Sequence, residues 1–336
     1  MSQFADELRS LVDDLALRDG TTPTGRAKLW GQLGELGLPR VGIAEERGGS
    51  GGTLDDLLVV VEALAGHGLS TPLVEASTAD WILSQVQDLD AKLSTVVLLD
   101  HAPLTDGDTV SAELTAVPWA RDADRLLLCA PGSALLAVDL RDASVAVRPG
   151  ENLAGEPRDT VRLTATPVAA VGPAVGAALA DAARERLALL WSAAVLGAAR
   201  GAYRLTKSYV AERRQFDAPL LAIPAVAGNV ALMRVHLVQA EAALALAREA
   251  EPFSGAVEVA RITTAAAATG IARIAHQLHG AMGITEEYPL HHLTRRLWSW
   301  RDAVASEREW AERLGRRAAE AGEDGVWTKL TATGRS

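Results

Sequence analysis

YVAERRQFDAPL, residues 209–220, is the stretch that decides how the rest of the chain is interpreted. A helical apolar pattern gives way here to Asp217, Ala218 and Pro219, and proline cannot continue a helix because it lacks a backbone N–H. Two arginines, an amide and an aromatic ring come together at this helix end. Guanidinium groups bind phosphates and carboxylates, and a ring offers a flat apolar surface. The stretch therefore predicts a binding site for an anionic, partly flat ligand.

A second stretch, QLHGAMGITEEYPLHHLTRR at residues 277–296, belongs with the first. Apolar residues at helical spacing lead into it, at Ile271, Ile274, Leu278 and Met282. The run ends in Gly280 and Gly283, where the absence of a side chain lets the backbone come close to a ligand. We expect the end of this helix to contribute to the same site.

Composition and charge exclude several classes of protein. With 336 residues, 49% of them hydrophobic, the chain can form about two or three globular domains. The net charge of −10 argues against a nucleic-acid partner, which needs a basic face. No apolar run approaches the roughly 20 residues that cross a bilayer, and the charged N-terminus does not resemble a signal peptide. We therefore predict a cytoplasmic protein without a membrane span.

The sequence offers no ligand set for a metal, but it has three arginine pairs that suit a phosphate. Cys129 is the only cysteine and lies in an apolar run, which excludes thiolate metal sites and disulfides and predicts a buried side chain. The histidines at 276, 279, 291 and 292 lack a set of carboxylates, so no metal site is predicted. Three arginine pairs could each serve a phosphate or be ordinary surface charge: Arg213–Arg214, Arg295–Arg296 and Arg316–Arg317.

The pattern of apolar residues changes twice along the chain. Residues 1–88 show helical spacing of apolar residues, and residues 89–172 show short Val- and Leu-rich runs with period-two alternation. Residues 173–322 return to amphipathic helices, and residues 323–336 are expected to form a frayed tail. Strands are predicted in runs that begin at Ser94, Asp124, Ala134, Ser144 and Asp159. One buried helical stripe is predicted at Leu232, Val235, Val238 and Ala242.

These motifs and their order resemble the acyl-CoA dehydrogenase family. Residues 30–52, WGQLGELGLPRVGIAEERGGSGG, are similar to its N-terminal helical domain, and Glu287-Tyr288-Pro289 match its Glu-Tyr-Pro without a gap. The resemblance covers nearly the whole chain. It implies an α+β fold: an N-terminal helical domain, a small antiparallel β middle domain and a C-terminal four-helix bundle.

The resemblance also implies a cofactor, FAD, and the residues that bind it. The family's Arg-x-x-Phe segment contacts the diphosphate of a flavin held mainly by a neighbouring subunit, and its Gln-x-x-Gly-Gly-x-Gly segment contacts the adenosine side. The matching residues here are Arg213, Gln215, Phe216, Gln277, Gly280 and Ala281, the last replacing a glycine. The implied partners are an acyl-CoA substrate, an electron-transfer flavoprotein or similar acceptor, and a second subunit of the same or a different chain. Each stretch alone also has a purely structural interpretation. Arg213 and Arg214 could be a solvated helix end, and Gly280 could allow tight helix packing.

The expected catalytic base is missing. The family abstracts the α-proton of its substrate with a carboxylate, most often a Glu followed by Gly-Thr. Counting from Gln277 places Val304 at that Glu and Ser306 over the Thr, which implies a flavin contact for Ser306. The alternative position used by some members is Leu187. Asp302 is the nearest carboxylate and the candidate base, with Glu185 and Glu307 more consistent with charged helix faces.

The middle domain departs from the family as well. Residues 90–172 lack the segments that hold the flavin ring, and GEPRDT at 155–160 resembles only faintly the family's Thr-Glu-Pro. Such shortened members resemble the small subunits of heteromeric acyl-CoA dehydrogenases that act on bulky groups such as sterol side chains. Two hypotheses follow: an FAD-dependent dehydrogenase subunit that forms a 2-enoyl-CoA, or a non-catalytic scaffold that supports a partner dehydrogenase.

Overall fold

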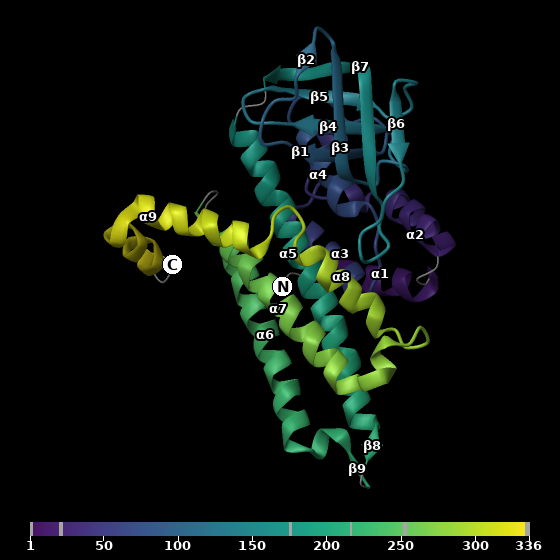
Figure 1. Cartoon of the computed structure of the whole chain (residues 1–336), viewed down its shortest axis with the longest axis vertical. Helices are drawn as coiled ribbons and strands as arrows, with labels where there is room; N and C mark the ends of the chain where they lie inside the picture. The colour runs from purple at the N-terminus through teal and green to yellow at the C-terminus, as the bar shows by residue number, and fades with distance from the viewer. Residues whose placement is uncertain (1–2, 20–22, 175–176, 216, 251–253, 333–336) are drawn as a thin grey trace.

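The computed structural model describes residues 3–19, 23–174, 177–215, 217–250 and 254–332. Helices at the N-terminus, a β-domain and a long helical bundle follow one another along the chain, as the sequence predicts (Figure 1). Phe216, one of the predicted flavin ligands, lies outside the described residues.

The N-terminal block consists of four helices and two short 3₁₀ turns: α1 (Gln3–Asp19), α2 (Pro23–Glu35), η1 (Leu38–Arg40), η2 (Glu45–Arg47), α3 (Leu54–Gly66) and α4 (Leu73–Ser84). Thr53 starts α3, because its hydroxyl accepts a hydrogen bond from the Asp56 N–H while the Asp56 carboxylate accepts one from the Thr53 N–H. Helix α3 is buried along most of its length and packs against α5 of the bundle. The N-terminal block and the bundle therefore share one hydrophobic core.

The β-domain contains seven strands: β1 (Ser94–Leu98), β2 (Thr105–Asp106), β3 (Thr109–Pro118), β4 (Arg125–Cys129), β5 (Ala134–Asp139), β6 (Val145–Arg148) and β7 (Arg158–Ala174). Their order is β1-β4-β5-β7-β3-β2, and β6 also pairs with β7. The five predicted strands are present, but the sequence analysis missed β2 and β3. The domain is not purely antiparallel, because β1 and β4 pair in parallel. Cys129 is buried in β4, as predicted.

The C-terminal region is a bundle of α5 (Ala177–Glu212), α6 (Pro224–Glu249), α7 (Ala256–His279) and α8 (Leu290–Arg301). Short elements join them: β8 (Arg214–Gln215), β9 (Ala218–Pro219), η3 (Leu220–Ala222) and η4 (Gly280–Ile284). Helix α9 (Glu307–Ala332) leaves the bundle and kinks at Gly322 (Figure 1). The prediction of a frayed tail from residue 323 was wrong for residues 323–332, which are helical.

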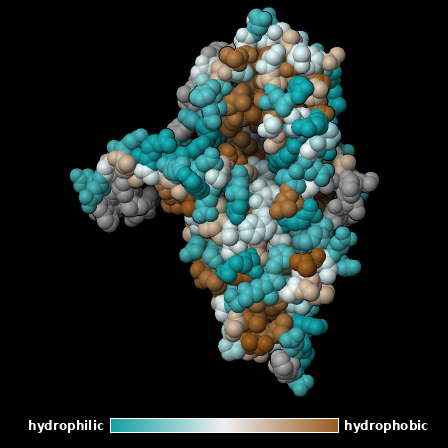
Figure 2. Space-filling view, in the orientation of Figure 1, coloured by the Kyte–Doolittle hydropathy of each residue, from teal (hydrophilic) through white to brown (hydrophobic). Residues whose placement is uncertain are grey.

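The predicted buried stripe on α6 was wrong. Leu232, Val235 and Val238 are 41%, 48% and 47% exposed, and Ala242 is exposed too. The residues that face α5 and α7 are instead Val230, Met233, Leu237, Ala240, Ala243, Leu244 and Ala247. Two apolar stripes at helical spacing run along α6, and the spacing is the same for both, so periodicity could not identify the buried one. Apolar surface is visible along this edge of the bundle (Figure 2).

Helix α6 has the length of a membrane-spanning helix, and because both of its faces are apolar it also has the hydrophobicity of one. Only 39% of its most hydrophobic window is buried. Its charged residues, however, bind other elements of the bundle and the N-terminal block. Glu241 binds Arg200 at 3.1 Å, and Arg248 binds Asp55 at 2.7 Å. In the described structure α6 is thus a bundle helix with one apolar face left exposed.

Two substitutions on α6 test this assignment of its faces. Met233→Ala should lower the free energy of unfolding of the isolated chain by about 2–5 kcal/mol, because it leaves a cavity at a fully buried position. Val235→Ala, on the exposed stripe, should change it by less than about 0.5 kcal/mol. Urea unfolding of both variants measures the difference, and equal losses would show that the Val235 face is buried.

Candidate functional site

The turn after α5 exposes the side chains that the sequence analysis assigned to the cofactor. The Arg213 N–H donates to the Tyr209 carbonyl at 2.8 Å, and the Arg213 carbonyl accepts from the Leu220 N–H at 2.8 Å. Between these bonds β8 and β9 form a small hairpin around Asp217, which has a φ of 61°. Arg213 and Gln215 are both exposed. Arg214 instead donates to the Asp217 carbonyl, so Arg213 is the guanidinium available to a ligand.

A stack of rings joins the end of α5 to the end of α7. The Tyr209 and His279 rings are nearly parallel with centroids 4.3 Å apart, and Tyr288 lies at the edge of Tyr209. His279 Nδ1 donates to the Ala275 carbonyl at 2.8 Å, which leaves Nε2 to accept from the Tyr288 hydroxyl at 3.2 Å. Burial lowers the pKa of His279, which favours this neutral form. The two motifs predicted to act together therefore lie at the same end of the bundle.

The end of α7 is open on its outer side. Gln277 and Ala281 are exposed. Gly280 has a φ of 58°, a conformation that favours glycine, and no heavy atom lies within 4 Å of the place where a side chain would begin. Exposed guanidinium and amide groups beside an open backbone suit the diphosphate and adenosine part of a dinucleotide.

The junction of the three domains is closed. Trp119 from the β-domain, Trp191 from α5 and Trp300 from α8 meet there against α3 and α4. The space left between them is about 30 Å³, roughly the volume of one water molecule. Neither a flavin ring nor an acyl group fits into this space.

Buried polar groups hold the junction together. The Trp300 indole N–H lies 3.0 Å from both carboxylate oxygens of Glu156, which is 1% exposed. Arg158 binds Glu75 of α4 at 3.0 Å and lies 3.8 Å from Glu156. Its guanidinium is also 6.0 Å from the centroid of the Trp191 ring. One short segment of the β-domain therefore binds both helical domains.

The sequence does not single out Glu156 and Arg158, because the GEPRDT segment that contains them resembles the family's Thr-Glu-Pro only faintly. A signal was available: a Glu and an Arg two residues apart on an extended chain point to the same face. Burial raises the pKa of Glu75 to about 7, against the opposing effect of Arg158.

The positions expected to carry the base do not form a cavity with a carboxylate. Leu187 is buried, and Val304 is 39% exposed with a φ of 72°. Asp302 follows α8 and its side chain, 44% exposed, binds Arg301 at 2.8 Å. The fully buried Arg261 holds this linker by donating to the carbonyls of Trp300, Arg301 and Ala303 at 3.0, 2.8 and 3.1 Å.

Ser306 starts α9. Its backbone N–H donates to the Glu309 carboxylate at 2.7 Å, and its hydroxyl accepts from the Glu309 N–H at 3.3 Å. This reciprocal cap gives Ser306 a structural role in the chain. Trp300 and Trp310 are buried, Trp300 at the junction and Trp310 in the first turn of α9, while Trp298 is half-buried.

Comparison with known proteins agrees with this architecture. The family model described as acyl-CoA dehydrogenase, N-terminal domain, matches residues 2–86, and that described as acyl-CoA dehydrogenase, C-terminal domain, matches residues 175–300. The chain is 26% identical to acyl-CoA dehydrogenase IpdE2 of Mycolicibacterium smegmatis, over 94% of this chain and 98% of that protein.

Solved structures show the same fold. The ChsE4-ChsE5 complex from Mycobacterium tuberculosis contains a chain with a TM-score of 0.86 and 22% identity, covering 96% of this chain and 99% of that one. The Tcur3481-Tcur3483 steroid ACAD variant contains a chain with a TM-score of 0.83 and 23% identity, covering 94% of this chain and 98% of that one.

The fold and both family models define the class of this protein as an oxidoreductase that acts on CH–CH groups. The chain belongs to the acyl-CoA dehydrogenase family.

The raised pKa of Glu75 predicts how stability depends on pH. The folded chain holds the Glu75 proton up to about pH 7, whereas an unfolded chain releases it near pH 4.5. The free energy of unfolding should therefore fall as the pH rises from about 4.5 to 7. Glu75→Gln should make this fall shallower by up to about 3 kcal/mol. Urea unfolding across this range measures it, with Glu113→Gln as the exposed control, and an unchanged slope would contradict the assignment.

Proposed function

We propose that this chain is a subunit of a heteromeric FAD-dependent acyl-CoA dehydrogenase and contributes the dinucleotide-binding end of its bundle to a flavin held mainly by the partner chain. The observation that carries the proposal is a contrast. The junction of the three domains is filled by Trp119, Trp191 and Trp300, yet Arg213 and Gln277 remain exposed at the bundle end.

The fit of FAD to this chain is therefore partial. Arg213, Gln215 and Gln277 would hold the diphosphate and adenosine, since they are exposed donors at the same end of the bundle as the open backbone of Gly280. A flavin ring does not fit into the space left at the junction. In the assembly the bound flavin supplies a hydride acceptor, and this chain's residues bind and orient its dinucleotide portion.

The exposed face of α6 supports an assembled protein. Leu232, Val235, Val238 and Leu246 present an apolar stripe on a helix that is otherwise packed in the bundle. Exposed stripes of this kind are covered in oligomers, where their burial contributes about 25 cal/mol per Å². Two of the structures with this fold are named for paired chains, ChsE4-ChsE5 and Tcur3481-Tcur3483, the second a steroid ACAD. By analogy we propose a different dehydrogenase chain as partner and a CoA thioester with a bulky, sterol-type acyl group as substrate.

In this arrangement the partner supplies the carboxylate that removes the α-proton. Leucine and valine at positions 187 and 304 cannot take a proton, and the Asp302 carboxylate is exposed and bound to Arg301. Among the residues between α8 and α9, Asp302 is the one that the sequence suggests as a base.

A non-catalytic scaffold is the second candidate. The closed junction supports it as well as it supports a subunit that contributes to a flavin site. The two candidates are a non-catalytic scaffold and a half-site, meaning a chain that contributes part of the flavin site of its partner. They differ only at the bundle end. In the scaffold Arg213 and Gln277 touch no cofactor, whereas in the half-site they contribute to its affinity.

Arg213→Ala distinguishes them. In a complex of this chain with its partner dehydrogenase, this variant should weaken FAD binding about 10–100-fold, the effect of losing a charge-assisted hydrogen bond of about 1.5–3 kcal/mol. Titration of the FAD-free complex followed by flavin fluorescence measures the affinity. Lys207→Ala removes a charge of the same sign from the same helix and should leave the affinity unchanged. Equal affinities for all three proteins favour the scaffold.

Asp302→Asn tests the source of the base. Turnover of the complex with an acyl-CoA and an electron acceptor should stay within about threefold of the original, because the partner carries out proton abstraction. A loss of about 100-fold or more with unchanged FAD binding would make Asp302 the base and contradict this part of the proposal. An isolated chain that is yellow would contradict the half-site itself.

A further inference from the structure

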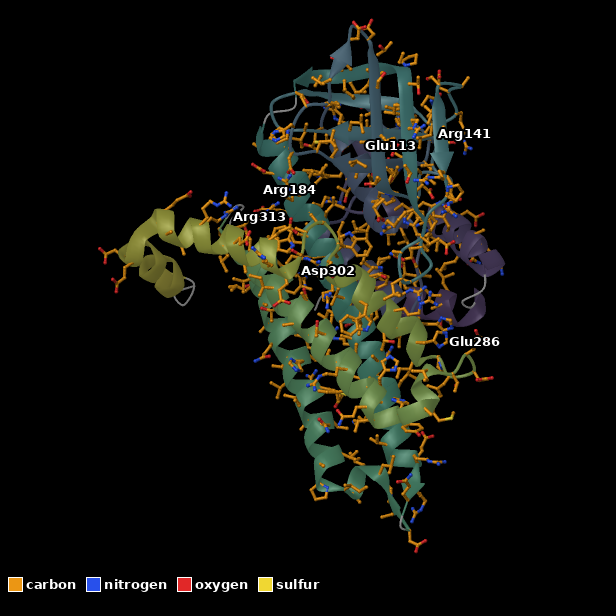
Figure 3. All side chains as sticks on the ribbon, viewed as in Figure 1. Glu113, Arg141, Arg184, Glu286, Asp302 and Arg313 are labelled. Atoms are coloured by element: carbon orange, nitrogen blue, oxygen red, sulfur yellow. The ribbon has the colours of Figure 1, made fainter. Side chains whose placement is uncertain are left out.

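A pocket of about 200 Å³ lies where α9 leaves the bundle, between α9 and the first turns of α5 and α7. At roughly 30 Å³ per water molecule, it has room for a small organic acid. Figure 3 shows Arg184 of α5 and Arg313 of α9 close together there, and both line the pocket. The Arg316–Arg317 pair, singled out in the sequence as a possible phosphate site, lines it as well.

This pocket is separate from the sites described above. Asp181, at its α5 side, and Arg213 are at opposite ends of one helix, about 45 Å apart at 1.5 Å per residue. It shares no lining residue with the closed junction. The proposed function therefore leaves the pocket unexplained.

Two deeply buried polar groups line the pocket without satisfying their hydrogen bonds. Trp310 is 2% exposed, and its indole N–H has no acceptor among the described residues. Glu258 is 3% exposed, with Oε1 bound to Arg317 at 3.0 Å and Oε2 without a donor in the described part of the chain. A buried donor and a buried acceptor left unpaired are costly, and their position in one pocket points to a ligand that pairs with both.

Charged side chains of both signs surround these groups: Arg184, Arg313, Arg316 and Arg317 line the pocket, and so do Asp181, Glu185, Glu258 and Glu320. Arg184 binds Asp181 at 3.2 Å, and Arg317 is held by Glu258. Arg313 lies over the Trp310 ring with its guanidinium 5.0 Å from the centroid, and neither it nor Arg316 forms an ion pair with another described residue. Arg313 is attracted to Glu309 only at longer range, so two guanidinium groups without a close ion pair in the described chain stand beside the unpaired indole N–H.

We propose that this pocket binds a small oxyanion with a hydroxyl group next to its charge. The anionic oxygens accept hydrogen bonds from Trp310 Nε1 and from Arg316, and the hydroxyl donates to Glu258 Oε2. A 2-hydroxycarboxylate has this chemistry, and so does hydrogen phosphate through its P–OH group. The proposal does not depend on flavin binding.

The indole N–H of Trp310 provides the readout. In spectra of the full chain with ¹⁵N-labelled tryptophan indoles, the Trp310 signal is identified by its loss in Trp310→Phe, which keeps an aromatic ring in the core. Four probes separate the parts of the ligand: glycolate, acetate without the hydroxyl, glycolamide without the charge, and inorganic phosphate.

Glycolate should shift the Trp310 signal saturably and bind about tenfold more tightly than acetate, because the extra hydroxyl meets a charged acceptor. Glycolamide should not shift the signal. If phosphate binds more tightly than glycolate, the pocket is a phosphate site. If glycolate binds more tightly, it is a hydroxyacid site. Arg316→Ala should weaken the preferred probe about tenfold. Arg308→Ala, on the same helix but bound to Glu312 at 2.8 Å, should not.

Three results would overturn the proposal. They are no saturable shift with glycolate or phosphate at millimolar concentration, equal binding of acetate and glycolate, and equal weakening by Arg308→Ala and Arg316→Ala. If Trp310→Phe fails to fold, the other indole signals lose their dispersion. The Trp310 signal is then identified as the one moved by Arg313→Ala, which removes the guanidinium stacked on that ring.

Discussion

The hydrogen bonds between the Trp300 indole and the buried Glu156 carboxylate fix how the β-domain sits on the bundle. A buried carboxylate is stable only when its charge and its oxygens are satisfied. Trp300 and Asn152 donate hydrogen bonds to Glu156, and the guanidinium groups of Arg158 and Arg296 lie 3.8 and 4.0 Å away. Arg158 in turn reaches Glu75 in the N-terminal block. Next in the chain, the fully buried Asp159 binds Arg121 at 2.6 Å and anchors the segment in its own sheet. One strand end thus ties together three domains.

This constraint explains why the junction has no room for a ligand. The three tryptophans meet over the network, and each supplies apolar surface to the charged groups below it. Enlarging the space would separate Glu156 from Trp300 and take the indole donor away from a buried carboxylate. The closed junction is therefore a stable state of the isolated chain, built from paired groups.

The same constraint places the surfaces open to other molecules elsewhere. The ring stack of Tyr209, His279 and Tyr288 presents the ends of α5 and α7 to the outside, and α6 exposes its second apolar stripe. A filled centre and an exposed rim support our proposal that this chain completes a site on another chain. The pocket beneath α9 lies at the opposite end of α5, where a ligand can bind independently of that contact.

The sequence alone determined the fold class, the order of the domains and the two motifs at the bundle end, because these are written in local periodicity and in short runs of residues with specific chemistry. It also showed that residues 187 and 304 cannot act as a base, since that depends only on side-chain identity. It could not decide which stripe of α6 is buried, because both have the same spacing and only the positions of α5 and α7 distinguish them. Nor could it show that Glu156 would fill the junction, or that Glu258 and Trp310 would share a pocket. Those contacts join residues far apart in the chain, and their energies depend on burial, which only the tertiary structure creates.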